Sequence, residues 1–366
     1  MHGPAGRQYC ERLTSRLHGY LLDRHRPMWE FTVMEGLQGN RFATYTKAHH
    51  ALLDGVSALR LLQSSLSEDP SDMTVRPPWS PRVRTDVFGA RDRDHDAAFD
   101  PIRAIGEFAK EIRGFGAATV KLINEAFREQ SATLSFQAPR SMFNVPITGA
   151  RRFAAQGWPL DRIKAVGKAA GATMNDVMLA MCAGALRRYM LDLGTLPDKP
   201  LVAAIPMSLR TDKSVGGNAI GLILCDLATT EADALTRLTT IHESMLKGKA
   251  VYHGMSRLQI TALSALPLIP LAVGTIPGMT RITPPAFNVL ISNVPGPRKP
   301  LYWNGARMQG VYPLSIPYEG QALNITVTGY AGSLEFGLTG CRRTVPHLQR
   351  LLGLLEESLE ELEKAV

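Results

Sequence analysis

Residues 42–66 read FATYTKAHHALLDGVSALRLLQSSL, and this stretch decides how the first part of the chain folds. Its first eight residues are rich in β-formers and follow a similar run, Phe31 to Glu35, across the turn-like pair Gly39-Asn40. This arrangement predicts a β-hairpin. Apolar residues then recur at helical spacing, and Asp54 suits the N-cap of that helix. Two adjacent histidines therefore lie between a strand and a helix.

His50 follows the predicted strand directly and precedes the tight turn Asp54-Gly55, a position from which a side chain can project into a crevice. A neutral imidazole, with an ordinary pKa of about 6.5, can take a proton from an alcohol near neutral pH. His50 is therefore a candidate general base, with His49 beside it. On spacing alone, a purely structural turn stays open. Metal binding by both rings is the weaker alternative, because adjacent strand residues point to opposite faces.

The composition indicates a globular chain with two cores of ordinary domain size, since 45% of its 366 residues are hydrophobic. The net charge of +8 suits anionic lipid surfaces, nucleic acid or phosphate-bearing substrates, or is simply a solvated basic surface. Nucleic acid ranks last, because the basic residues are scattered and no nucleic-acid motif occurs. The four cysteines show no CxxC spacing, which argues against a disulfide framework or a zinc site. A reducing cytoplasm fits, and no secretory signal is expected.

The first half of the chain is expected to contain two more helices and a linker. Leucines at four-residue spacing predict a helix from Cys10 to Leu22. Residues 67–101 are rich in Pro, Asp, Arg and Ser, which is typical of a linker, and a helix should follow from Ile102 to Glu129. Prolines at 139 and 146 then suggest a crossover between lobes. We therefore expect an amino-terminal lobe over residues 1–145 and a carboxy-terminal lobe over residues 151–366.

The second half alternates irregularly between helix and strand patterns. Helices are predicted at Leu160–Ala169, Asn175–Leu191 and Pro346–Lys364, and strands at Leu201–Pro206, Ala219–Leu227, Ala286–Ser292, Leu323–Tyr330 and Ser333–Thr339. The helix at 175–191 is apolar on more than one side and should be buried. This alternation predicts an α/β sandwich of mixed sheets, not a doubly wound parallel sheet.

The stretch from Leu258 to Thr280 carries no charged residue and approaches the length of a membrane span. Pro267, Pro270 and Pro277 would each interrupt the hydrogen bonds of a spanning helix. A buried core helix is the leading interpretation, with an interfacial or acyl-chain-contacting segment second.

Several runs together resemble one known family. HHALLDG (residues 49–55) matches the HHxxxDG signature of the wax ester synthase/diacylglycerol acyltransferase family, which belongs to the CoA-dependent acyltransferases. HHxxxDG alone is shared with peptide-synthetase condensation domains. The ensemble, in family order, is far more specific: RPMWE (26–30), MNDVMLA (174–180), PMSLR (206–210), GNAIG (217–221), PLIP (267–270) and SNVPGP (292–297).

The resemblance implies a two-lobed, chloramphenicol-acetyltransferase-like α/β (α+β) fold with mixed sheets. It implies His50 as general base, His49 as a supporting neighbour, and Asp54 in an ion pair with Arg210. Gly55 completes the motif. Asn175 and Asp176 of the ND pair are expected near the active-site channel, although a helix N-cap explains Asn175 equally well. Asn293 matches a family residue, yet a turn before Val294-Pro295-Gly296 would also explain it.

The implied reaction is direct acyl transfer from a long-chain acyl-CoA to diacylglycerol or a fatty alcohol, with no cofactor and no metal. No GxSxG-type nucleophile motif occurs, so no covalent acyl-enzyme is indicated. The expected location is cytoplasmic, peripheral at the inner membrane, an anionic membrane or lipid bodies, with no nucleic-acid partner.

The chain departs from the family at its beginning. Family members carry an LSPxD-like run and opening strands before the block that RPMWE resembles, so the first lobe is expected to be truncated, with an unpaired sheet edge. Two other interpretations therefore stay open. One is a truncated, inactive lipid-surface binding module, and the other is a condensation-type domain that uses carrier-protein thioesters.

Overall fold

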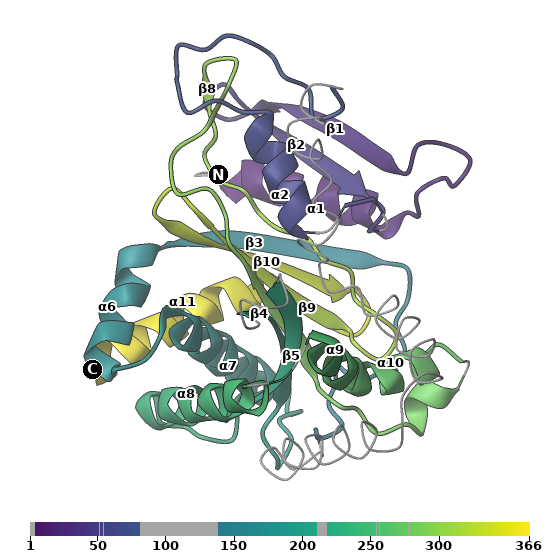
Figure 1. Cartoon of the computed structure of the whole chain (residues 1–366), viewed down its shortest axis with the longest axis vertical. Coiled ribbons are helices and arrows are strands. Elements are labelled where there is room, and N and C mark those ends of the chain that lie inside the picture. Colours follow the sequence, from purple (N-terminus) through teal and green to yellow (C-terminus); the bar gives the residue numbers. More distant parts are fainter. Residues whose placement is uncertain are drawn as a thin grey trace.

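A six-stranded mixed sheet lies at the centre of the molecule (Figure 1). The computed structural model describes residues 4–50, 52–53, 55–80, 138–210, 218–253, 255, 257–276 and 278–366. The expected helix from Ile102 to Glu129, most of the linker's length and the side chain of Asp54 lie outside the described residues.

The sheet has the strand order β3-β10-β9-β6-β4-β5. Neighbours pair antiparallel except β4 with β6 and β6 with β9, which are parallel. The predicted α/β class with mixed sheets is therefore confirmed. The strands are β3 (Arg151–Pro159), β4 (Val202–Arg210), β5 (Asn218–Asp226), β6 (Val289–Val294), β9 (Leu323–Tyr330) and β10 (Ser333–Cys341).

The observed bounds of β4 and β6 differ from the predicted ones. The strand expected to end at Pro206 continues to Arg210. Proline lacks a backbone donor, but β4 pairs with β6 only at Ala203 and Ala204, so Pro206 leaves no bond to that neighbour unmade. The strand expected from Ala286 begins at Val289, because at Asn288 the side-chain oxygen, not the backbone carbonyl, accepts the N–H of Val202 on β4.

One face of the sheet is covered by α6 (Leu160–Ala170), α7 (Met174–Asp192), α8 (Ala234–Val251) and α11 (Arg350–Ala365). α7 lies at the middle of this layer and is buried on nearly all sides, as predicted. The carboxy-terminal helix begins at Arg350, four residues later than expected, after His347 adopts a positive φ of 52°. The layer and the sheet enclose the largest hydrophobic core.

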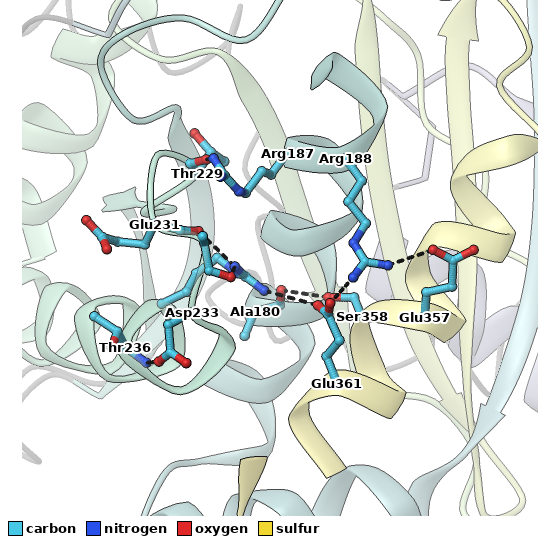
Figure 2. Close-up of polar contacts among 12 residues, drawn as sticks. Ala180, Arg187, Arg188, Thr229, Glu231, Asp233, Thr236, Glu357, Ser358 and Glu361 are labelled. Carbon is cyan, nitrogen blue, oxygen red and sulfur yellow. Dashed lines mark hydrogen bonds and ion pairs between the residues drawn. The ribbon is translucent and has the colours of Figure 1, made fainter. Parts of the chain in front are cut away.

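Arginines and glutamates join the three longest of these helices. Figure 2 shows Arg187 and Arg188 on α7, with Arg188 beside Glu357 and Glu361 of α11. Arg237 of α8 is buried and donates to the carbonyl oxygens of Glu231 and Ala232.

The amino-terminal part forms a small second layer above the sheet (Figure 1). It comprises α1 (Pro4–Gly19), β1 (Trp29–Leu37), β2 (Arg41–Ala48) and α2 (Gly55–Ser64). The predicted hairpin is confirmed, and Gly39 and Asn40 both have positive φ, at 77° and 52°. The first helix begins at Pro4 and ends at Gly19, so its predicted bounds of Cys10 to Leu22 were wrong at both ends. Gly19 lies against the backbone of Gly149 and Arg151.

A segment of the carboxy-terminal half crosses between the two layers. It contains the short hairpin β7 (Tyr302–Trp303) and β8 (Ala306–Arg307), and Tyr302 exchanges backbone hydrogen bonds with Ser67 of the first lobe. Residues 310–317, which we call the strap, then return across the sheet. A Cβ at Gly337 of β10 would overlap the carbonyl oxygen of Pro313, so the strap lies directly on that strand.

The uncharged stretch near residue 258 forms short helices separated at prolines. These are α9 (Arg257–Ala265), η2 (Leu266–Leu268), α10 (Ile269–Gly274) and η3 (Met279–Arg281). α9 packs on β5 with Ala262, Leu263 and Ser264 buried, which favours the core-helix interpretation. Among the described helices, none taken singly is long and apolar enough to cross a membrane. The bent pair of α6 and α7 passes that test by length and composition only.

Candidate functional site

His49 and His50 follow the last residue of β2, Ala48, and lie in a turn. The backbone N–H of His49 donates to Met28 at 2.9 Å, and that of Leu52 donates to His49 at 2.8 Å. This turn leaves the side chain of His50 exposed, while that of His49 is half-buried. The ring of His50 is thus accessible to a substrate, as its proposed proton transfer requires.

The first residue of α2, five residues after His50, lies against the end of β6 in the carboxy-terminal lobe. A Cβ at Gly55 would lie 3.8 Å from Cγ2 of Val294, so the first turn of α2 approaches this strand closely. Asn293 lies within β6, paired with Val327, so the alternative that placed it in a turn was wrong. Gly296 follows at a point where a Cβ would overlap the carbonyl oxygen of Gly329, which explains the glycine in SNVPGP.

The ND pair begins α7, and its two residues have different environments. The N-cap of α7 is Thr173, so the alternative that Asn175 caps the helix was wrong. The Nδ2 atom of Asn175 is buried and has no hydrogen-bond partner among the described residues. An unpaired buried donor is costly unless a ligand or water meets it. Asn175 therefore remains a candidate for a substrate contact.

Asp176 has a structural arrangement that the sequence did not reveal. One carboxylate oxygen, Oδ2, accepts hydrogen bonds from the backbone N–H and the hydroxyl of Thr173, at 2.9 and 2.7 Å. His242 of α8 lies 2.7 Å from the same oxygen through Nδ1. Asp176 is 1% exposed, so this carboxylate fixes the start of α7 against α8. The missed partner lies 66 residues away, in a helix that the sequence pattern did not predict.

The expected ion pair between Asp54 and Arg210 involves side chains outside the described residues. The backbone of Arg210 pairs with Asn218 at the start of β5. The ion pair stays a prediction.

Two apolar hollows lie beneath the PLIP element. The first is lined by Pro267, Pro270 and Thr280 among others, and the second by Leu290, Ile316 and Tyr318 among others. Neither is lined by His50. Leu290 and Val294 are four residues apart on β6, or about 13 Å along a strand. The second hollow and the start of α2 thus adjoin opposite ends of one strand.

Comparison with known proteins identifies the class. The first condensation domain of the calcium-dependent antibiotic synthetase superposes with a TM-score of 0.54 at 17% identity, over 100% of this chain and 76% of that one, and shares the fold. The wax ester synthase/diacylglycerol acyltransferase of Marinobacter aquaeolei superposes with a TM-score of 0.75 at 41% identity, over 99% of this chain and 78% of that one.

Sequence relatives agree with this likeness. Residues 1–178 match the wax ester synthase/diacylglycerol acyltransferase catalytic domain, and residues 216–363 match the carboxy-terminal domain of the same family. A putative diacylglycerol O-acyltransferase of Mycobacterium tuberculosis is 54% identical over 97% of this chain and 78% of its own length. The O-acyltransferase WSD of Acinetobacter baylyi is 41% identical over 96% of this chain and 77% of its own length.

The chain belongs to the wax ester synthase/diacylglycerol acyltransferase family, and it is an acyltransferase. The resemblance stated from its motifs is confirmed. The matches cover nearly the whole of this chain and 78% of the length of these two relatives, and they give no support to the expected truncation of the first lobe. The alternatives of a lipid-surface binding module and a condensation-type domain are not favoured.

Proposed function

We propose that the chain transfers an acyl group from a long-chain acyl-CoA to diacylglycerol, giving triacylglycerol, or to a fatty alcohol, giving a wax ester. The observation that carries the proposal is the placement of the HHxxxDG turn. It leaves the side chain of His50 exposed, five residues before Gly55, which contacts the end of β6, in a chain of this family. The names of relatives from Mycobacterium and Acinetobacter support the same reaction class.

In the proposed mechanism, the neutral imidazole of His50 removes the hydroxyl proton of the alcohol. The alcohol oxygen attacks the thioester carbonyl and a tetrahedral oxyanion forms. The C–S bond then breaks, the ester is released, and the proton held by His50 passes to the departing CoA thiolate. The buried Nδ2 donor of Asn175 is the candidate partner for a substrate oxygen, and no cofactor beyond the acyl-CoA co-substrate is needed.

We further propose a cytoplasmic location, peripheral at an anionic membrane or a lipid-body surface. A net charge of +8 favours anionic lipid headgroups. Trp29 and Trp79 stack with ring centroids 5.6 Å apart, and both are more than two-fifths exposed. Exposed tryptophans suit the boundary between headgroups and acyl chains. Cosedimentation with anionic and neutral vesicles tests this location.

The function is tested by thiol release from a long-chain acyl-CoA, with diacylglycerol or a fatty alcohol as acceptor. His50→Ala should lower the rate by about 10² to 10⁴, which is typical for the loss of a general base. His25→Ala is the matched control, because His25 is exposed in the loop before β1 and should leave the rate unchanged. A folded His50→Ala variant that keeps the parent rate would refute the assignment of His50.

A further inference from the structure

His18, near the end of α1, connects the two layers of the molecule. Its Nδ1 lies 3.0 Å from the hydroxyl of Tyr45 on β2, and its Nε2 lies 3.2 Å from the carbonyl oxygen of Ser315 in the strap. Tyr45 is 5% exposed. The half-buried imidazole therefore lies between a strand of the first lobe and a segment from the second.

The partners of His18 determine its protonation. A carbonyl oxygen only accepts, so Nε2 must carry the proton and donate it to Ser315. Nδ1 of the neutral ring then accepts from the hydroxyl of Tyr45. Burial lowers the pKa of His18 to about 4, and burial raises the pKa of Tyr45, so the ring is neutral and the phenol protonated near pH 7.

The connection continues from the strap into the central sheet. The hydroxyl of Ser315 lies 2.8 Å from that of Thr326 on β9. Thr326 donates to Oδ1 of Asn324 at 2.9 Å and accepts from the hydroxyl of Ser292 on β6 at 3.2 Å. Since the one proton of Thr326 goes to Asn324, Ser315 must donate to Thr326. Each hydroxyl group in this hydrogen-bond network then has one defined acceptor for its proton.

The two ends of this hydrogen-bond network, Tyr45 and Ser292, lie on the strands that adjoin the candidate site. Tyr45 lies on β2 five residues before His50. Ser292 lies on β6 two residues before Val294, which faces Gly55. The strap contacts both layers. Pro313 lies so close to Gly337 of β10 that a Cβ there would overlap its carbonyl oxygen, and Leu314 packs against the core of the first lobe.

We propose that His18 is a positioning residue for acyl transfer, which sets the distance and angle between β2, the strand that leads into the turn with His50, and β6, the strand whose end contacts Gly55. The inference rests on the proposed role of His50. His18 touches no reacting atom. It acts through Tyr45 and Ser315, because a fixed donor and a fixed acceptor on one rigid ring hold β2 at one place on the strap.

The first test compares three variants in the thiol-release assay. His18→Phe keeps a ring but removes both hydrogen bonds, and kcat should fall about 10- to 100-fold, as expected for a displaced catalytic group, with KM for acyl-CoA changed less than about two-fold. His18→Gln retains a donor and an acceptor and should recover most of that loss. Tyr45→Phe should lower kcat, and adding it to His18→Phe should cause no further loss, because both changes break one connection. His25→Phe is the control.

A second measurement reads the geometry without activity. Amide hydrogen exchange in His18→Phe should quicken over residues 41–50 and the strap, and stay unchanged over α11. In an active parent chain, an unchanged kcat in His18→Phe overturns the inference. If the parent chain transfers no acyl group, or His50→Ala keeps full rate, the proposed function fails. Unchanged exchange over β2 and the strap overturns the role of His18 in every case.

Discussion

Asp176 shows how one carboxylate can fix a helix and its neighbour together. It is nearly inaccessible, yet its Oδ2 collects the backbone N–H and hydroxyl of Thr173 and faces His242. A buried carboxylate is tolerated only with such partners. The other oxygen of Asp176, Oδ1, and the Nδ2 atom of the adjacent Asn175 are buried and have no hydrogen-bond partner among the described residues. The ND pair thus combines one structural contact with two polar atoms that are available to a ligand.

Asp176→Ala should destabilise the fold by about 1–3 kcal/mol, because it removes the N-cap partner of Thr173 and the partner of His242 together. Urea unfolding gives the free energy directly. Asp161→Ala is the control, since Asp161 is an exposed residue in the first turn of α6. Equal destabilisation in both variants would contradict the assigned role of Asp176.

Gly337→Ala should destabilise the chain by about 1–3 kcal/mol, because the added methyl group would overlap the carbonyl oxygen of Pro313. The methyl group would push the strap away from β10, so acyl transfer should fall as well. Gly329→Ala on the adjacent strand is the control, since its nearest neighbour would lie 4.0 Å from the new Cβ. Thermal unfolding and thiol release test both effects, and a Gly337→Ala chain as stable as Gly329→Ala would contradict the close contact.

At the scale of elements, α7, α8 and α11 are joined by charged side chains as well as by apolar packing. Arg237 lies 1% exposed between them, 3.7 Å from Glu361. Burial, with help from the positive charges of Arg187 and Arg188, lowers the pKa of Arg237 to about 10, so the side chain is still charged at pH 7. Its main contacts are carbonyl oxygens at the end of the loop that precedes α8, near Thr236 and Asp233 in Figure 2.

Arg237→Met should therefore lower the free energy of unfolding by about 1–3 kcal/mol, because hydrogen bonds from a charged donor to buried carbonyl oxygens are lost. Arg188→Met is the matched control on the facing helix. Its side chain is 32% exposed and its ion pairs are partly solvated, so a loss below about 1 kcal/mol is expected. Chemical unfolding of both variants checks the order, and a larger loss in Arg188→Met would contradict it.

Elements with a strong local pattern were predicted correctly from the sequence. The hairpin carries its turn signal at Gly39-Asn40, and β9 has its predicted bounds, Leu323–Tyr330. The long elements β3 and α8 were missed, and so was the short hairpin of β7 and β8. β3 begins with two arginines and contains Gly157, two features that weaken a strand pattern. A Cβ at Gly157 would overlap the side chain of Glu335 on the neighbouring strand. Distant contacts of this kind leave no periodic signal.

α8 was missed for the same physical reason. It contains three threonines and Gly248, residues that disfavour helices. Gly248 is needed because a Cβ there would overlap Cγ2 of Ile223. Residues of the site were likewise predicted where the signal is local and missed where it depends on distant contacts. His50 was found through its local motif, whereas His18 was missed because its contact to Ser315 spans 297 residues.

At the scale of the whole molecule, the two layers meet through the strap and a cluster of aromatic rings. Trp303 of β7 lies 6.0 Å from the rings of both Phe31 and Phe42 of the first lobe, measured between centroids. Phe31 also meets Trp79 edge to face. These contacts hold the lobes together by apolar burial, which is not directional. The hydrogen bonds through His18 add a defined orientation, and they depend on its protonation.

Acidification should therefore weaken the molecule through His18. Burial is the main cause that lowers its pKa from 6.5 to about 4, and the nearby charges of Lys47 and Arg151 act in the same direction, against the hydrogen bond to Ser315. Between these two pH values the unfolded chain binds a proton at this residue and the folded chain does not, so the free energy of unfolding falls as the pH falls from 6.5 to 4.

Other groups oppose this loss of stability at low pH, so the contribution of His18 must be measured as a difference between variants. Burial raises the pKa of Glu335 and of Asp226, so the folded chain holds protons there that the unfolded chain releases, and these carboxyls favour folding as the pH falls. The difference between the parent and His18→Gln, followed by urea unfolding at several pH values, isolates His18. We expect the parent to lose stability relative to His18→Gln as the pH falls from 6.5 to 4, and His25→Gln to follow the parent. If the difference between parent and His18→Gln is independent of pH, His18 is not the neutral bridge between the lobes.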